Sequence, residues 1–259
     1  MSLLMKRWRS LLALGLMTMI MQTAGCGQVV IGGKSASDVF TDPQTLALVN
    51  AACAGDIPKI DTLVKQGASV NATGYRDMTV LIWTMECHNH GGAERLLQLG
   101  ANPNFKMKQS GDMSAMWLAA GSSDPRWLPM MLARGGDPNI RAGFQTALMG
   151  TIEEGRIHQA RYLLAHGADV NEHDSGGNTA ATYAAGLAKF DVVEMLLRHG
   201  YDYDLEGLAL SVNNRVGPEY PKSYKQMKKV LEMLKKRGVV FPLPPPGIAG
   251  PPPGVNGGN

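Results

Sequence analysis

The sequence predicts an all-α solenoid of about six repeats, each built from a pair of short helices. Five glycines recur at intervals of 32 to 35 residues, and each opens a similar segment: 67–71, 100–104, 135–139, 167–171 and 200–204. A short apolar stretch precedes each glycine, and a sixth stretch at 230–234 is followed by Gly238. Helices of two or three turns are unstable alone in water, so these helices must stack on neighbouring repeats.

The spacing of apolar residues places two helices in each repeat. The inner helices are expected at 44–54, 79–88, 114–122, 146–154, 179–187 and 206–214, and the outer helices at 57–66, 92–99, 126–134, 157–166, 190–199 and 222–237. Asp42 and Pro43 suit the start of the first helix. Each turn glycine is expected just after an outer helix with a positive φ. The Asn or Asp four residues later is expected to bond its own backbone.

These repeats resemble ankyrin repeats. Residues 163–171 read LLAHGADVN and residues 174–179 read DSGGNT, both similar to the family pattern. The family's T-P-L-H signature is replaced by TVLI at Thr79, SAMW at Ser114, TALM at Thr146 and TAAT at Thr179. The resemblance covers about residues 44 to 238. It implies β-hairpin loops between repeats and a concave protein-binding surface made of hairpin tips and inner helices.

Carrying that surface onto this sequence gives the candidate protein-binding residues. They are Tyr75, Arg76, Met78, Glu86, Phe105, Lys106, Lys108, Arg141, Phe144, Gln145, Glu153, His173 and Asn178. Aromatic and Arg side chains are enriched at interface hot spots. Each residue taken singly can equally be an ordinary surface side chain. Trp83, Trp117 and Tyr183 are expected to fill the stack instead.

The first 25 residues are typical of a lipoprotein signal peptide. Lys6, Arg7 and Arg9 precede the apolar run 11–21, which is too short to span a bilayer as a helix. Thr23-Ala24-Gly25-Cys26 resembles a lipobox, which implies lipidation of Cys26 and a membrane anchor. Gly27 stands where Asp would favour inner-membrane retention, so we expect a periplasm-facing protein on the outer membrane.

The remaining chain divides into three parts. Residues 26–41 are expected to be a lipidated tether, 42–240 the repeat domain, and 241–259 a disordered Pro- and Gly-rich tail. The formal charge is +3, from 25 basic and 22 acidic residues, and three of the basic residues lie in the leader. The mature chain is therefore neutral, which gives no general attraction to nucleic acid.

Two cysteines, Cys53 and Cys87, remain after Cys26. They fall on neighbouring inner helices, and helix axes about 8–10 Å apart suggest a poor fit for a disulfide. Two reduced thiols are thus favoured, with one disulfide as the alternative. In the final outer helix, Lys and Arg residues indicate a solvated cap or, alternatively, a patch for anionic lipid or an acidic partner.

No sequence motif indicates catalysis. The segment Cys87-His88-Asn89-His90 fits a turn between two helices better than a nuclease or metal site, because further ligands are not evident. The sequence contains no P-loop, G-x-G-x-x-G or G-x-S-x-G. Glu153 and Glu154 are adjacent and point in different directions on a helix. We therefore expect no enzyme activity, no cofactor and no metal.

The functional hypothesis is a membrane-anchored, periplasm-facing binding module that is monomeric when unbound. Its most concrete form is an immunity protein that neutralises a secreted toxic effector, such as a lipase. The reason is that ankyrin-repeat lipoproteins resemble immunity proteins of contact-dependent secretion systems. The alternatives are an envelope scaffold or assembly lipoprotein with a resident partner, and a metal-dependent hydrolase.

Overall fold

The computed structural model describes residues 29–213 and 221–241. The chain divides into two compact units. Unit 1 comprises the described residues up to Pro103 together with Met107–Ser110, and unit 2 comprises Asn104–Lys106 and the described residues from Gly111 onward. The leader, Cys26 and the expected tail at 242–259 lie outside the described residues. Each unit is described by itself below.

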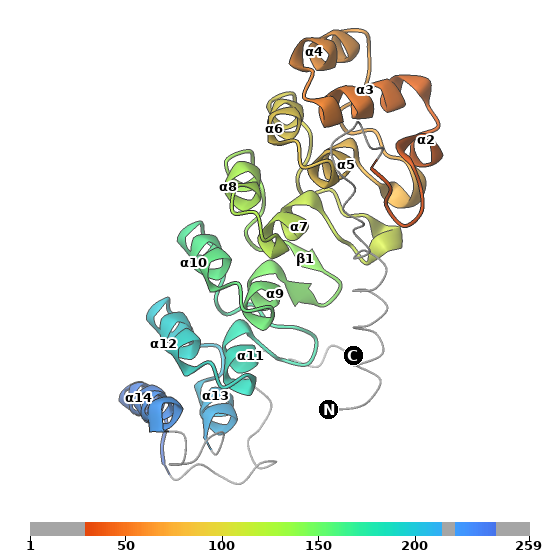
Figure 1. The fold of residues 1–259 in the computed structure, drawn as a ribbon. Coiled ribbons are helices and arrows are strands. Elements are labelled where there is room, and N and C mark those ends of the chain that lie inside the picture. The colour runs from red at the N-terminus through yellow and green to blue at the C-terminus, as the bar shows by residue number, and fades with distance from the viewer. Residues whose placement is uncertain (1–28, 214–220, 242–259) are drawn as a thin grey trace. The chain divides into compact units, whose positions relative to one another are not determined.

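Unit 1 holds two helix pairs and a short N-terminal helix (Figure 1). Its elements are α2 Ala36–Val39, α3 Pro43–Ala54, α4 Ile57–Lys65, the 3-10 turn η1 Tyr75–Asp77, α5 Val80–Glu86, α6 His90–Gln98 and the 3-10 turn η2 Lys108–Ser110. The inner helix α3 packs against α4, α5 and α6. As expected, α3 starts at Pro43, and the Asp42 carboxylate accepts a hydrogen bond from the Thr45 N–H at 2.7 Å.

Unit 2 holds four helix pairs in two layers (Figure 1). Its elements are α7 Ala115–Gly121, α8 Trp127–Leu132, β1 Arg141–Ala142, β2 Gln145–Thr146, α9 Ala147–Glu153, α10 Ile157–Ala165, α11 Ala180–Gly186, α12 Phe190–Arg198, α13 Leu205–Val212 and α14 Pro221–Lys236. The inner helices α7, α9, α11 and α13 pack in sequence order. Strands β1 and β2 form an antiparallel hairpin that pairs Arg141 with Thr146.

The predicted helix-pair solenoid is confirmed, with helix ends shifted by a few residues. All six turn glycines have φ between 83° and 102°: Gly67, Gly100, Gly135, Gly167, Gly200 and Gly238. Small residues allow the helices to approach closely. A Cβ added to Gly92 on α6 would lie 2.0 Å from the Ala52 carbonyl oxygen of α3, so only glycine fits there.

The asparagines four residues after the turn glycines link consecutive repeats, which corrects our expectation that they bond their own backbone. Asn71 Nδ2 donates to the Gly100 carbonyl at 3.0 Å, and Asn71 Oδ1 accepts from the Asn102 N–H at 2.8 Å. Asn104 and Asn139 make the corresponding bonds to the next turn. Asn171 accepts from the Asp202 N–H in the same way, but its Nδ2 donates to the Asp202 carboxylate. An amide side chain both donates and accepts, so it can satisfy two groups of the next turn at once.

The end of the expected tether belongs to the folded body. Phe40 is 1% exposed, and its ring meets Trp83 edge-on at a centroid distance of 5.7 Å. Val39 is also buried, and Ile31 pairs with Lys34 in an isolated β-bridge. The short helix α2 also packs against α3, so this segment covers part of the first repeat.

Cys53 and Cys87 form a disulfide, which corrects the expectation of two reduced thiols. Their Cα atoms lie 5.4 Å apart. The expectation used the distance between helix axes, whereas the geometry of a disulfide limits the distance between the two Cα atoms. Cα atoms lie about 2.3 Å from a helix axis, so facing residues on packed helices approach much closer than the axes do.

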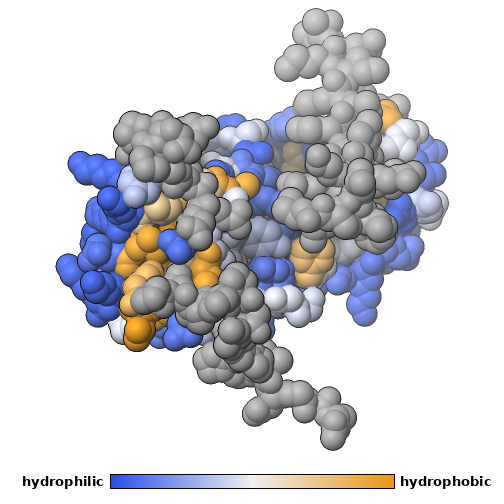
Figure 2. Space-filling view, turned by 90° about the horizontal axis from the view of Figure 1, so that it is seen from below, coloured by the Kyte–Doolittle hydropathy of each residue, from blue (hydrophilic) through white to orange (hydrophobic). Residues whose placement is uncertain are grey.

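Some basic side chains at the C-terminal end of unit 2 form ion pairs or hydrogen bonds within the fold. Lys229 pairs with Glu194 at 2.8 Å, and Arg237 donates to the Tyr201 carbonyl at 2.7 Å and to the Leu197 carbonyl. Figure 2 shows apolar residues gathered over the α13–α14 end of the molecule, with hydrophilic residues around them. Among the described residues, no helix is both long and apolar enough to cross a bilayer.

Candidate protein-binding surface

The hairpin tip of unit 1 presents an aromatic ring with basic neighbours. Tyr75 is 55% exposed, and Lys34 Nζ lies 4.6 Å from the centre of its ring. Arg76 has a positive φ of 56° and donates to the Gln109 carbonyl of η2. The Asp77 carboxylate accepts from the Gln109 N–H at 3.3 Å. These bonds hold η1 against η2 and leave the Tyr75 ring facing outward.

Three other predicted residues of unit 1 differ in exposure. Lys108 on η2 is exposed, whereas Met78 and Glu86 are half-buried. Burial raises the pKa of the Glu86 carboxyl above its usual value, and the nearby His88 partly offsets this effect. Glu86 is the last residue of α5, and its carboxyl is partly shielded from water there.

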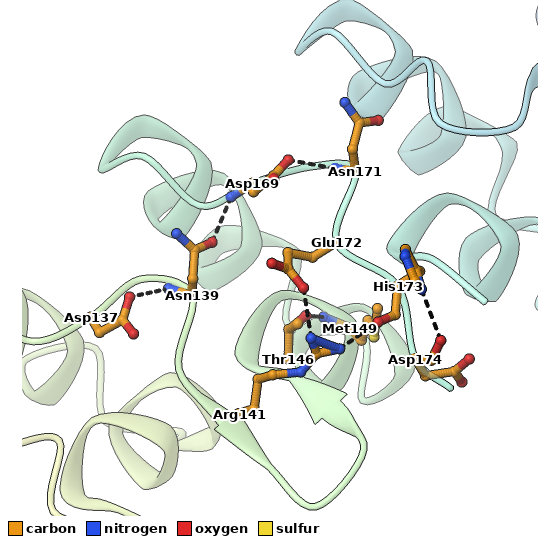
Figure 3. Close-up of polar contacts among 10 residues, drawn as sticks. All are labelled: Asp137, Asn139, Arg141, Thr146, Met149, Asp169, Asn171, Glu172, His173 and Asp174. Atoms are coloured by element: carbon orange, nitrogen blue, oxygen red, sulfur yellow. Dashed lines mark hydrogen bonds and ion pairs between the residues drawn. The ribbon is translucent and has the colours of Figure 1, made fainter. Parts of the chain in front are cut away.

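The β1–β2 hairpin of unit 2 presents Phe144, which is 57% exposed. Below the tip, Arg141 Nη1 lies 2.6 Å from the Glu172 carboxylate, and Arg141 also donates to the His173 carbonyl (Figure 3). The side chains of this ion pair are 32% and 37% exposed. Arg141 therefore ties its own hairpin to the next one, and its guanidinium is only partly available to a partner.

A polar cluster joins the inner helices α9 and α11. Gln145 Nε2 donates to the Glu153 carboxylate at 2.8 Å. The Tyr183 hydroxyl donates to Asp174 Oδ2 at 3.3 Å. The pKa of Tyr183 is raised, first by burial and also by the charges of Asp174 and Glu153, while its hydrogen bond with Gln145 acts in the opposite sense. The cluster therefore places a phenol and carboxylates side by side on the inner face of unit 2.

Asn178 and His173 serve mainly to fix the turn that the His173–Thr179 bridge closes in unit 2. The buried Asp174 carboxylate accepts from the N–H groups of Gly176 and Asn178 at 2.9 and 2.8 Å, and Asn178 Nδ2 also donates to it. The His173 ring stacks on Tyr203 at 4.5 Å. Both predicted residues are thus engaged within the fold.

The predicted stretch around Phe105 falls on the boundary between the units. Phe105 is 36% exposed and Lys106 is exposed, and both belong to unit 2, whereas Lys108 belongs to unit 1. The candidates therefore fall into two sets, one on each unit. Lys34, Asp174 and Tyr203 were not among the residues predicted from the sequence, and the D-x-x-G pattern at Asp174 was the one available signal.

The residues expected to fill the stack do so to different degrees. Trp83 is 1% exposed, as expected, whereas Trp117 and Tyr183 are half-buried. His88 has a left-handed backbone in the turn between α5 and α6, and Asn89 caps α6 by accepting from the Gly92 N–H. This confirms the turn predicted at residues 87–90. Within 29–213 and 221–241, no group of three or more His, Cys, Asp or Glu side chains could hold a metal.

Comparison with known proteins supports the architecture. Residues 115–206 match the family model of ankyrin repeats, in three copies. Protein PhlB of Serratia liquefaciens is 30% identical over 148 residues, which are 56% of this chain and 64% of PhlB. The B-cell lymphoma 3 protein homolog of Mus musculus is 25% identical over 149 residues, 56% of this chain and 33% of that protein. The matches thus span less than two thirds of these relatives.

A solved structure shows the same fold. The crystal structure of an ankyrin repeat domain from Acinetobacter baumannii AYE superposes with a TM-score of 0.58 at 24% identity, covering 73% of this chain and 97% of that one. Residues 115–206 therefore match ankyrin repeats, and the chain has the ankyrin-repeat solenoid fold.

Proposed function

We propose that this protein is a lipid-anchored, periplasm-facing module that binds another protein through its hairpin tips and inner helices. The observation that carries the proposal is the exposure of Tyr75, Phe105 and Phe144 on successive hairpins, at 55%, 36% and 57%. Aromatic side chains are enriched among the residues that dominate interface energies. The concrete form is an immunity protein for a secreted toxic effector, with a lipase as the first candidate.

The disulfide supports an exported protein. Disulfides persist in the periplasm and in other oxidising compartments and are rare in the cytosol. The Cys53–Cys87 bond joins α3 to the C-terminal end of α5 in unit 1, and bonds of this kind are rarely formed in a reducing compartment. Acylation of Cys26 is tested by metabolic labelling with palmitate, and Cys26→Ser should abolish the label and release the protein from membranes.

The immunity role is tested with the product of the neighbouring gene. That product, directed to the periplasm, should stop growth, and co-expression of this protein should restore it. The double variant Tyr75→Ala/Phe144→Ala should lose the rescue and weaken binding of the purified partner by roughly 1,000-fold, because hot-spot aromatics contribute about 2 kcal/mol or more each and every 1.4 kcal/mol is tenfold. Tyr162→Ala on the outer helix α10 is the matched control and should retain both.

An envelope scaffold or assembly lipoprotein is the second candidate. It would bind a resident, non-toxic envelope protein, and the same aromatic variants would weaken that complex without any effect on survival. If the neighbouring product is harmless and no rescue is seen, the immunity role is wrong. A metal-dependent hydrolase is the third class. Absence of bound metal from the purified protein, together with normal behaviour of His88→Ala and His90→Ala, would eliminate it.

A further inference from the structure

The outer face of α14 carries a row of lysines that faces solvent. We define the lysine stripe as the six exposed lysines of this helix: Lys222, Lys225, Lys228, Lys229, Lys235 and Lys236. The buried Met227, Val230 and Leu234 recur at helical spacing and lie on the opposite side of the helix. The stripe is roughly 21 Å long, because each helical residue rises about 1.5 Å. It therefore forms one extended cationic face.

The positive charge of this helix is not matched by acidic residues. Residues 221–237 contain seven basic residues and one acidic residue, Glu232, which gives a net charge of +6. The other described residues of unit 2 contain eight basic and thirteen acidic residues, a net charge of −5. Of the six lysines, Lys229 alone forms an ion pair with another described residue, Glu194, which also pairs with Arg198. Unit 2 is therefore polarised, with much of its positive charge concentrated on α14.

The energetics of the helix itself do not account for the stripe. A helix dipole favours basic residues in the last turn and acidic residues in the first, yet α14 has no acidic residue in its first turn and carries Lys222 and Lys225 near its start. Lys225 also lies three residues before Lys228 and four before Lys229, spacings at which like charges repel. A solvated outer face needs only mixed charges, such as those of α12. An anionic surface bound to the stripe would offset both costs.

The composition of the stripe favours a lipid surface over an acidic protein. Its six cations are all lysines, which are depleted at protein interfaces and lack the planar fork with which Arg binds a carboxylate. Clusters of basic residues on a helix are typical of binding to anionic lipid. Tyr224, whose ring centre lies 4.6 Å from Lys228 Nζ, adds a side chain of a type that is enriched at membrane–water interfaces. Interchangeable lipid phosphates therefore suit these flexible charges better than one fixed protein surface does.

We propose that the lysine stripe binds the headgroups of anionic phospholipid and holds the C-terminal end of unit 2 on a membrane. The presence of the protein at a membrane rests on the proposed lipid anchor, whereas the affinity of the stripe is a property of the folded chain alone. The probe is therefore the chain without its leader and with Cys26→Ser, which carries no acyl group. Failure of the immunity role leaves this measurement unaffected, and labelling with palmitate tests the acylation separately.

The experiment is co-sedimentation of that chain with vesicles of phosphatidylcholine, with and without phosphatidylglycerol. Binding should require phosphatidylglycerol, weaken at high salt and fall on the order of tenfold or more in Lys222→Glu/Lys225→Glu. These changes place acidic residues near the start of α14, where the helix dipole favours them, so a less stable helix would not explain the loss. The matched control is Lys59→Glu/Lys65→Glu, which makes the same charge change on the exposed surface of α4 and should leave binding unchanged.

A gain of binding provides a second test that unfolding cannot imitate. Glu232 is the one acidic residue of α14, and it is exposed among the lysines. Glu232→Gln should strengthen binding to the phosphatidylglycerol vesicles several-fold, because it removes the one repulsive charge from this face. Glu94→Gln on the exposed face of α6 makes the same change away from the stripe and should have no effect.

Four outcomes would overturn the proposal. Three of them concern the vesicles: no binding to either kind, an equal loss in both lysine pairs, or an unchanged affinity of Glu232→Gln. The fourth concerns the product of the neighbouring gene. If Lys222→Glu/Lys225→Glu loses that protein but keeps its binding to vesicles, the stripe binds an acidic protein and not a membrane.

Discussion

Unit 1 and unit 2 join their inner helices in different ways. In unit 1 the disulfide between Cys53 and Cys87 links α3 to α5 covalently. In unit 2 the positions eight residues after the capping Ser or Thr, where unit 1 has Cys87, are Ser122, Glu154 and Leu187. In unit 2, polar side chains near these positions link consecutive repeats. One of them is Lys189, whose Nζ donates to the Ile152 carbonyl at 3.0 Å. The stability of unit 1 should therefore depend on redox state, and that of unit 2 should not.

The units also differ in how a terminal face is covered. In unit 1, α2 packs on α3 and the Phe40 ring meets Trp83 of α5. Unit 2 ends with α14, which buries Val230 and Leu234 and is also held to α12 by the Lys229–Glu194 ion pair. Both ends therefore depend on apolar packing, to which unit 1 adds a covalent bond. Hydrogen exchange measured on separate peptides can test this comparison, because it reports the opening of each unit locally.

The largest effect is expected from Phe40→Ala. Removing a fully buried ring that packs on Trp83 should lower the free energy of unfolding of unit 1 by about 3–5 kcal/mol. Exchange should accelerate in peptides of α3 and α5. Val240→Ala, at a 75% exposed position, is the control and should change little. Unchanged exchange in unit 1 would show that residues 36–40 do not cap it.

Removal of the disulfide should come next. Cys53→Ala/Cys87→Ala should lower the free energy of unfolding of unit 1 by about 3–4 kcal/mol, because the bond closes a loop of 34 residues in the unfolded chain. A reducing agent should have the same effect on the wild-type chain and none on the double variant. Equal acceleration of exchange in unit 2 would contradict the division between the units.

Loss of one asparagine link should lower the free energy of unfolding of unit 2 by a moderate amount. Asn139 accepts from the Asp169 N–H at 2.7 Å and donates to the Gly167 carbonyl at 3.4 Å. Asn139→Ala should cost about 1–2 kcal/mol, since each hydrogen bond contributes about 1 kcal/mol net. Asn50→Ala on the exposed face of α3 is the control. An effect of the control as large as that of Asn139→Ala would mean that these links are not specific.

The Arg141–Glu172 ion pair should matter less. Both side chains are about one third exposed, so the pair should contribute about 0.2–1 kcal/mol to the free energy of unfolding. A double-mutant cycle with Arg141→Ala and Glu172→Ala, measured by chemical denaturation at low and high salt, gives the coupling energy. The coupling should shrink at high salt. A coupling well above this range would mean that the hairpin link is a major stabiliser of unit 2.

The sequence predicted the repeats well because each turn glycine has a local physical cause. Gly167 and its counterparts need a positive φ, and the apolar residues before them need a neighbouring repeat. The two main errors concern long-range contacts. The burial of Phe40 depends on the place of Trp83 in the fold, and the disulfide depends on the Cα separation of two facing residues. No local pattern encodes either distance.

The candidate surface was predictable in part for the same reason. Exposed aromatic tips such as Phe144 follow directly from hairpin position, and their roles in binding stay a prediction. The partner of Arg141 could not be foreseen, because it depends on the register between one hairpin and the next. The partner of Asn178 depends on the conformation of a single turn. The same residue types stabilise the fold and bind partners, so the type of a residue alone does not show which of the two it does.

The smallest expected effect is a pH dependence in unit 1 that comes from Glu86. Burial raises the pKa of this carboxyl in the folded state above its ordinary value of 4.5, so the folded chain binds the proton more tightly than the unfolded chain. The resulting stabilisation is fully present below the unfolded pKa and is lost as the pH rises through the folded pKa. Glu86→Gln should therefore increase the free energy of unfolding at pH 7 and flatten its decline above pH 4.5. The measurement is denaturation across this pH range, with Glu94→Gln on the exposed face of α6 as the control. A variant that is less stable than the wild type at pH 7 would show that the Glu86 charge is stabilised in the fold and not penalised by burial.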